Sequence, residues 1–221
     1  MSPRPRTVDD PTILDAAIRV LGRTGPEKLT LAHVGEESGL SAATLVQRFG
    51  SKRALLLAVM KHAIAGTNER HAAALNSSDS ALEAIFTCAM DRTGSHAGPD
   101  VVGNLFAFYL SDLSDPEFRA LTVENSRNAI EGFKQLLDKA VENGELSETY
   151  VDTQQLAETI YSLMMGTLLS WTVSGGEGNY RARVRKELDV LLRPFRRGPR
   201  KATGLSHDVE RKIIAAPAFE R

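Results

Sequence analysis

Residues 31–49 of this 221-residue chain read LAHVGEESGLSAATLVQRF, and this stretch decides the fold. Thr30 and Ser41 are residue types that cap the N-termini of helices, and each is followed by helix-forming residues. The pattern therefore predicts two short helices, one over 31–38 and one over 42–49.

The two helices need a sharp turn and a close crossing. Gly39 permits the left-handed backbone of a tight turn, and Gly35 is small enough for a helix crossing. The apolar residues that would lock the helices together are Val34, Leu40 and Leu45. Such a unit is a helix-turn-helix, which predicts DNA binding; a purely structural helical hairpin is the alternative.

Helical periodicity continues on both sides of this unit, and strand signals are almost absent. Asp10-Pro11 predicts the start of a first helix, which Gly22 and the Gly25-Pro26 pair are expected to end. Further helices are predicted from Ser51 to about Leu75, around Ala81–Ala89 and Val102–Leu113, from Pro116 to Asn143, from Asp152 to about Val173, and from Tyr180 to Leu192. The chain is therefore expected to be all-α.

Charge is unevenly distributed along the chain, although the net charge is only -1. Residues 1–62 carry +3, residues 63–180 carry -11 and residues 181–221 carry +7. This segregation fits one part that faces DNA and one part that repels it, although ordinary solvated surface charge explains it equally well.

Composition and motifs exclude several classes of function. With 42% hydrophobic and 25% charged residues, the chain has the composition of a globular protein. The single Cys88 cannot form an internal disulfide, and the N-terminal stretch resembles no signal peptide, so a cytoplasmic protein without a membrane segment is expected. We find no catalytic motif and no metal-ligand spacing, so we expect no enzyme activity, no metal and no cofactor.

Residues 13–59 resemble the TetR family of bacterial transcriptional repressors. The family pattern has a threonine-capped helix, a Gly-Val-Ser turn, Thr-Leu-Tyr-x-His-Phe and Ser-Lys-x-x-Leu. This chain has Thr30-Leu31, Gly39-Leu40-Ser41, Thr44-Leu45-Val46-Gln47-Arg48-Phe49 and Ser51-Lys52-Arg53-Ala54-Leu55. The resemblance implies a DNA-binding domain over 1–55, a helical ligand-binding and dimerisation domain over 56–195, and a basic tail over 196–221.

The resemblance also implies roles for individual residues. The 42–49 helix would enter the major groove, where glutamine can bond adenine and alanine methyl groups can meet thymine methyl groups. Base edges would be faced by Ala42, Ala43 and Gln47, and phosphates would be held by Thr30, Thr44, Arg48 and Lys52.

Two residues depart from the family pattern. Val46 stands where the family often has a phosphate-binding Tyr; it either leaves that contact empty or touches a thymine methyl group. Arg48 stands where the family often has His, and either replaces the phosphate contact or reads guanine. His33 could face the DNA backbone or solvent, and Arg4 and Arg6 could enter the minor groove or remain solvated.

A small-molecule effector is a further implication of the resemblance. The proposed lining combines aromatic and Met side chains with polar groups on otherwise apolar helices, although such residues are more often plain core. The candidates are Phe86, Met90, Phe106, Tyr109, Asn125, Phe133, Tyr161 and Met165.

The helix predicted over 152–173 is apolar on several faces, which fits one side in the core and another against a second subunit. Leu168 and Trp171 are the predicted contacts of a homodimer. The expected function is a homodimeric repressor that a small hydrophobic molecule releases from a palindromic operator. Two alternatives are a helical carrier or enzyme with a structural helix-turn-helix, and an activator that answers another partner.

Overall fold

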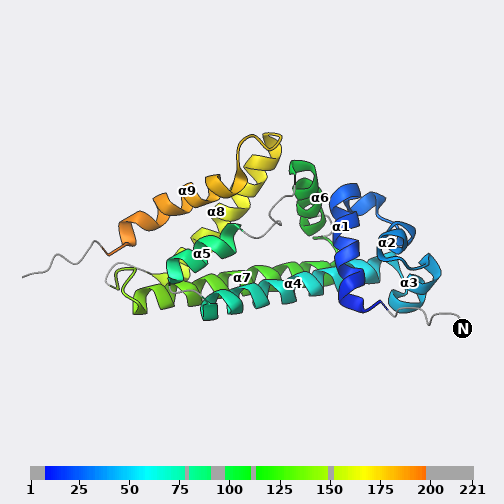
Figure 1. Cartoon of the computed structure of the whole chain (residues 1–221), viewed down its shortest axis with the longest axis horizontal. Helices are drawn as coiled ribbons and strands as arrows, with labels where there is room; N and C mark the ends of the chain where they lie inside the picture. The colour runs from blue at the N-terminus through cyan, green and yellow to red at the C-terminus, as the bar shows by residue number, and fades with distance from the viewer. Residues whose placement is uncertain (1–7, 78–79, 91–97, 111–112, 149–151, 198–221) are drawn as a thin grey trace, which may run out of the picture.

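The computed structural model describes residues 8–77, 80–90, 98–110, 113–148 and 152–197, and these residues form helices without a β-strand (Figure 1). The all-α expectation is confirmed. The α-helices are α1 (Asp10–Lys28), α2 (Leu31–Ser38), α3 (Ala42–Phe49), α4 (Lys52–Ser77), α5 (Ala81–Met90), α6 (Pro99–Leu110), α7 (Pro116–Glu142), α8 (Thr153–Val173) and α9 (Tyr180–Leu192). Arg4, Arg6, most of the loop before Pro99 and nearly all of the basic tail lie outside the described residues.

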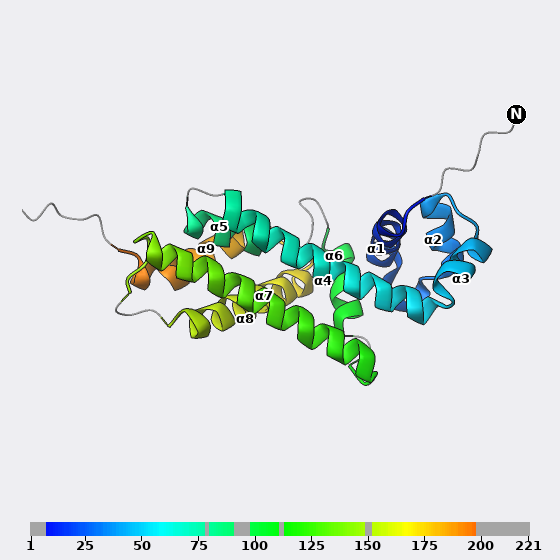
Figure 2. The same cartoon turned by 90° about the horizontal axis from the view of Figure 1, so that it is seen from below.

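Two long helices, α4 and α7, lie side by side along the molecule (Figure 2). They run in the same direction, because Arg53 at the start of α4 pairs with Asp115 at the start of α7, and Lys139 near the end of α7 bonds the Leu75 carbonyl near the end of α4. α1–α3 occupy one end of this pair, and α8 and α9 lie toward the other (Figure 1). The long pair therefore connects the helix-turn-helix to the C-terminal helices.

The first helix differs from its prediction at its N-cap and at Gly22, whereas the predicted break at Gly25-Pro26 is present. Its N-cap is Asp9, whose carboxylate accepts the Thr12 N–H, rather than Asp10. Gly22 does not end the helix; the backbone kinks at Gly25, where φ is 76°, and a last helical stretch continues to Lys28. A glycine is needed at position 22 because α6 approaches closely there: a Cβ at Gly22 would lie 2.8 Å from Val101 Cγ1.

Two hydrophobic clusters form the core. The first joins α1–α4 to α6 and α7 through Phe108, Phe118 and Leu121. The second joins α5, α7, α8 and α9 around large buried side chains such as Phe133. Because α4 passes residue 55 without a break, the DNA-binding part and the regulatory part share one continuous helix.

α6 is covered on more than one side. Val102 is buried, and Phe108 packs edge-on against Phe118 with ring centroids 6.2 Å apart. Leu113 lies beyond the end of α6 and is exposed. Because α6 packs against both α1 and α8, no single stripe marks its buried side.

Glu145, just after α7, holds the start of α5. Its carboxylate accepts hydrogen bonds from the Ser80 hydroxyl and from the backbone N–H groups of Ala81 and Leu82. Burial opposes ionisation, but these bonds and one from Asn143 outweigh it, so the pKa of Glu145 is lowered. The carboxylate thus satisfies N–H groups that a helix start leaves without partners.

Glu145→Ala should lower the free energy of unfolding at neutral pH by about 0.5–2 kcal/mol, the range for loss of a helix-capping side chain. The folded-state pKa lies below the unfolded value, so this stabilisation is complete above the unfolded pKa and is lost as pH falls through the folded pKa. The free energies of unfolding of wild type and variant, measured in urea, should therefore converge only once the pH has fallen below the folded-state pKa of Glu145. Glu142→Ala, at an exposed glutamate, is the control; a pH-independent difference for Glu145→Ala would contradict this role.

Candidate nucleic-acid interface and effector site

Side-chain caps and two glycines build the helix-turn-helix. Thr30 Oγ1 accepts the His33 N–H at 3.2 Å at the start of α2, and Ser41 Oγ accepts the Thr44 N–H at 3.1 Å at the start of α3. Gly39 has φ 72° and ψ 23°, the left-handed conformation predicted for the turn. A Cβ at Gly35 would lie 2.6 Å from the Leu40 carbonyl oxygen, so the predicted close crossing is confirmed.

α3 is fixed on one side and free on the other. Leu45 is fully buried against the first cluster, whereas Ala43, Val46 and Gln47 are exposed. The side chain of Val46 is 48% exposed although it is apolar. α3 lies at the outer end of the molecule, so its exposed face is open to a partner (Figure 1).

Three of the predicted phosphate-binding groups already have partners within the chain. The Arg48 guanidinium donates to the Val8 carbonyl and pairs with Asp10 Oδ1 at 3.2 Å. Lys52 Nζ donates to the Glu27 carbonyl at 2.9 Å, and the Thr44 hydroxyl bonds Ser41 Oγ at 2.8 Å. The guanidinium of Arg48 and the ammonium of Lys52 keep further N–H donors beside these bonds, so a phosphate can share them.

An ion-pair cluster that the sequence did not reveal holds α2 on α1. Glu37 pairs with Arg19 at 2.7 Å and with Arg23 at 2.6 Å. Hydrogen bonds from these two guanidinium groups lower the pKa of Glu37. The i, i+4 spacing of Arg19 and Arg23 was the available signal, because it places both on one face of α1.

Polar groups from three helices meet in the regulatory half. Asn125 of α7 is 2% exposed; its Nδ2 donates to the Tyr109 hydroxyl at 3.4 Å, and its Oδ1 has no hydrogen-bond partner among the described residues. One residue further along α7, the Ser126 and Tyr161 hydroxyls lie 2.8 Å apart. The structure thus brings predicted lining residues of α6, α7 and α8 to one turn of α7.

The other predicted lining residues are more scattered. Phe86 is buried on α5 beneath the Arg185 guanidinium, 4.6 Å from its ring centroid, which places it toward α9. Phe133 packs edge-on against His71 on the α4 side. Met90, Phe106 and Met165 are partly buried. Phe86 and Phe133 therefore belong to the second core cluster.

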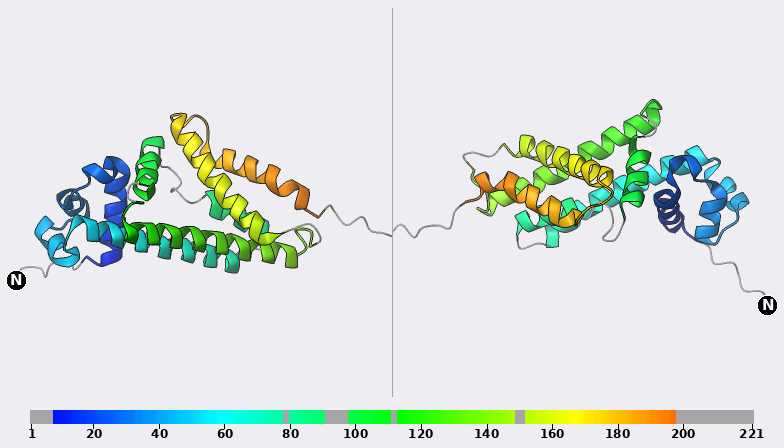
Figure 3. Two further views of the ribbon diagram at one scale, coloured as in Figure 1. Left: turned by 180° about the vertical axis from the view of Figure 1, so that it is seen from behind. Right: turned by 90° about the horizontal axis from the view of Figure 1, so that it is seen from above.

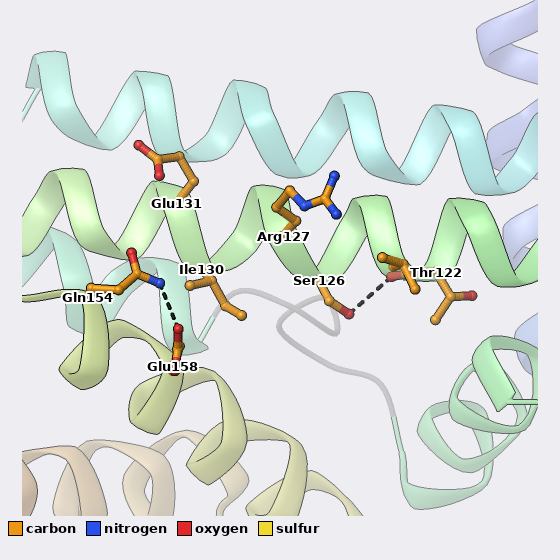
Figure 4. A pocket seen from close by; sticks show the side chains of 8 residues that line it. Thr122, Ser126, Arg127, Ile130, Glu131, Gln154 and Glu158 are labelled. Atoms are coloured by element: carbon orange, nitrogen blue, oxygen red, sulfur yellow. Dashed lines mark hydrogen bonds between the residues drawn. The ribbon is translucent and has the colours of Figure 1, made fainter.

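A groove of about 400 Å³ lies between α7 and the start of α8 (Figure 4). Its wall combines the apolar Val123 and Ile130 with the hydroxyl of Ser126. The remaining lining residues are polar or charged: Thr122, Arg127, Glu131, Gln154 and Glu158. Ser126 thus joins this groove to the turn of α7 that carries the buried Asn125 amide.

In the described part of the chain, no group of three His, Cys, Asp or Glu side chains could hold a metal ion. None of the described helices has both the length and the hydropathy needed to cross a membrane.

Residues 13–59, which contain the helix-turn-helix, match the family described as bacterial regulatory proteins of the tetR family. Residues 13–59 are thus a DNA-binding domain of the TetR family. The matched residues include both helices of the motif and the first part of α4.

Relatives and solved structures extend the similarity beyond the motif. The HTH-type transcriptional regulator BetI of Paraburkholderia xenovorans is 26% identical over 187 residues, covering 81% of this chain and 89% of that protein. BetI of Brucella anthropi is 28% identical over 110 residues, covering 49% of this chain and 57% of that protein. A transcriptional regulator from Saccharomonospora viridis in complex with choline has the same fold, with a TM-score of 0.67, 19% identity, and coverage of 82% of this chain and 94% of that one.

The two predicted dimer residues lie in the interior of the chain. Leu168 is 5% exposed and belongs to the second core cluster. Trp171 packs on Tyr180, with ring centroids 5.6 Å apart, and its Nε1–H donates to the Gly178 carbonyl. Both side chains are therefore covered by their own chain and are not free to contact a second subunit.

Gln47 and Lys52 variants should differ in kind. Gln47→Ala should cost about 1–3 kcal/mol of binding and relax preference at one base pair, because a bidentate base contact is lost. Lys52→Ala should weaken binding to all sequences alike and lower the salt slope by about 1, because a phosphate contact is lost. Gel shifts on selected and scrambled duplexes across salt concentrations measure both; equal losses on every duplex for both variants would contradict the assignment.

Proposed function

We propose that the chain is a homodimeric repressor, acting in the cytoplasm, that a small hydrophobic molecule releases from a palindromic operator. The observation that carries the proposal is the open face of α3, with Ala43, Val46 and Gln47 exposed opposite the buried Leu45. Residues 1–55 would bind DNA, and residues 56–195 would bind the effector and the second subunit. BetI of Paraburkholderia xenovorans, similar over most of its length, is also a transcriptional regulator.

The outer face of α8 and α9 supports the dimer (Figure 3). On α8 the exposed residues Ser162, Gly166, Leu169 and Val173 follow a spacing of four, three and four, which places them in one stripe. Leu169 and Val173 are 47% and 78% exposed, and α9 adds the exposed Val190. A Cβ at Gly166 would meet nothing within 4 Å, so this stripe is open and suits close helix packing.

Pairing of this face across a two-fold axis would form a four-helix bundle. It would also fix the separation of the two α3 helices. Two half-sites are read together only when the recognition helices lie roughly 34–36 Å apart, or a multiple of that distance. The dimer therefore sets the operator spacing.

Substitutions of two neighbouring leucines on α8 test this dimer. Leu169→Glu should give a folded monomer with weak operator affinity, because the charge lies on the face proposed to pair. Leu168→Glu should lose the fold instead, because the same charge would be buried in the core. Circular dichroism, sedimentation, and binding to palindromes selected from random DNA separate these results. A Leu169→Glu dimer with full operator affinity would contradict the proposed interface.

We place the effector at the turn of α7 that carries Asn125. A buried carbonyl oxygen without a hydrogen-bond donor costs about 1–3 kcal/mol, and a bound molecule with an O–H or N–H group would remove that cost. Around it, Tyr109 and Tyr161 add aromatic surface and hydroxyl groups. The neighbouring groove has two carboxylates and one guanidinium, which favours a neutral or cationic molecule over an anion. The Saccharomonospora viridis structure contains choline, a cation with a hydroxyl group.

Two contacts would carry an effector signal from this site to the DNA-binding helices. Asn104 of α6 donates through Nδ2 to the Gly22 carbonyl of α1 at 2.8 Å. Arg53 of α4 pairs with Asp115 at 2.7 Å and with Glu117 at 3.0 Å at the start of α7, and the Arg53 guanidinium lowers the pKa of Asp115. Because α6 and α7 also hold Tyr109 and Asn125, an effector that preferred another arrangement of these helices would shift the population away from the DNA-binding geometry.

Asn125→Leu should leave operator binding intact while weakening release by an effector, because only the effector loses its hydrogen-bond acceptor. Choline and pairs of an alcohol with its methyl ether are suitable probes, since the ether keeps the apolar body but lacks the donor. In wild type, the alcohol should raise the melting temperature and release DNA more strongly than its methyl ether does. In Asn125→Leu, the two compounds should have equal effects.

Asn128→Leu, one turn away and partly buried, is the matched control. Loss of DNA binding together with the fold in Asn125→Leu would make Asn125 a structural core amide. The effector site would then have to involve other residues.

A further inference from the structure

We propose that α3 reads the 5-methyl groups of thymine through Val46 and Ala43, so that the centre of each half-site is rich in A·T pairs with thymine facing these two residues. The inference rests on the proposed placement of α3 in the major groove. It adds the base chemistry that the groove-facing side chains select.

The geometry of α3 places the two apolar side chains at the centre of its free face. At 3.6 residues per turn, Val46 and Gln47 project within roughly 60° of Ala43, whereas Leu45 projects to the opposite side. Leu45 is fully buried, so the face that carries the other three is turned away from the protein. This face therefore presents one methyl group, one isopropyl group and one amide.

The hydrogen-bonding groups nearest to this face are engaged elsewhere. Arg48 projects to the flank and is held there by Val8 and Asp10, and the Thr44 hydroxyl bonds Ser41. Gln47 is thus the one side chain on the central face of α3 that can bond a base edge. A face with one amide and two apolar groups cannot read several bases by hydrogen bonds.

Thymine is the base that matches such a face. Every base edge in the major groove offers donors or acceptors, but only thymine also offers a methyl group. Val46 is nearly half exposed, and an apolar group can cover it without burying a polar group that would lose its own hydration. Gln47 beside it bonds adenine through N6 and N7, so the three side chains together select A·T pairs.

The test removes single methyl groups from DNA. Full-length protein first selects its site from random duplexes, and each thymine of that site is then replaced by deoxyuridine, which keeps every Watson–Crick hydrogen bond. Burial of one methyl group predicts a loss of roughly three- to fivefold in affinity at one or two positions per half-site. A duplex that carries cytosine in place of that thymine should bind more weakly. Replacing this cytosine by 5-methylcytosine should then restore part of the affinity.

Protein variants assign the contact. Val46→Ala should abolish the thymine-to-uracil difference at one position, and Ala43→Gly should do so at another. Leu110→Ala, at an equally exposed apolar residue (48%) at the end of α6, should change nothing. Equal affinity for thymine and deoxyuridine duplexes in wild type, or an unchanged difference in Val46→Ala, would overturn the inference while leaving DNA binding established. Failure to select any duplex would instead overturn the proposed function.

Discussion

The close crossing of α2 and α3 at Gly35 is the contact on which the DNA-binding surface depends. A Cβ at this position would lie 2.6 Å from the Leu40 carbonyl oxygen, which is backbone and cannot move aside. The crossing lets Leu45 reach the core and turns Ala43, Val46 and Gln47 outward. Which side chains of α3 face outward therefore depends on the missing Cβ of Gly35 on α2.

The parallel pair of α4 and α7 carries this local geometry into the rest of the molecule. One end of the pair is fixed by the Arg53–Asp115 ion pair beside the DNA-binding helices, and the other by Lys139 and the Leu75 carbonyl. The first hydrophobic cluster takes residues from α6 and α7 as well as from α1–α4. A rearrangement around Asn125 would thus reach α1 through packed side chains and without a hinge in α4.

The C-terminal helices show how one apolar helix serves two surfaces. The inner face of α8 is consumed by its own chain, where Trp171 packs on Tyr180 and Leu168 is buried. Its outer face retains Leu169 and Val173 at the surface, with α9 beside it. Exposed apolar side chains in a stripe are characteristic of an interface, which supports a second copy of the chain as the occupant.

The sequence by itself determined the helices, their caps and the helix-turn-helix, because these depend on spacings within a few residues. Thr30, Gly35, Gly39 and Ser41 act through neighbours in the chain, so their roles are readable from order alone. Only the tertiary structure decided which face of an apolar helix is covered. Gly22 lies inside α1, where its missing Cβ leaves room for Val101 of α6, and Trp171 is interior because α9 folds back on α8. The sequence likewise did not reveal the partners of Arg48 or the missing hydrogen bond of Asn125 Oδ1. Both depend on which distant groups the fold brings within hydrogen-bond distance.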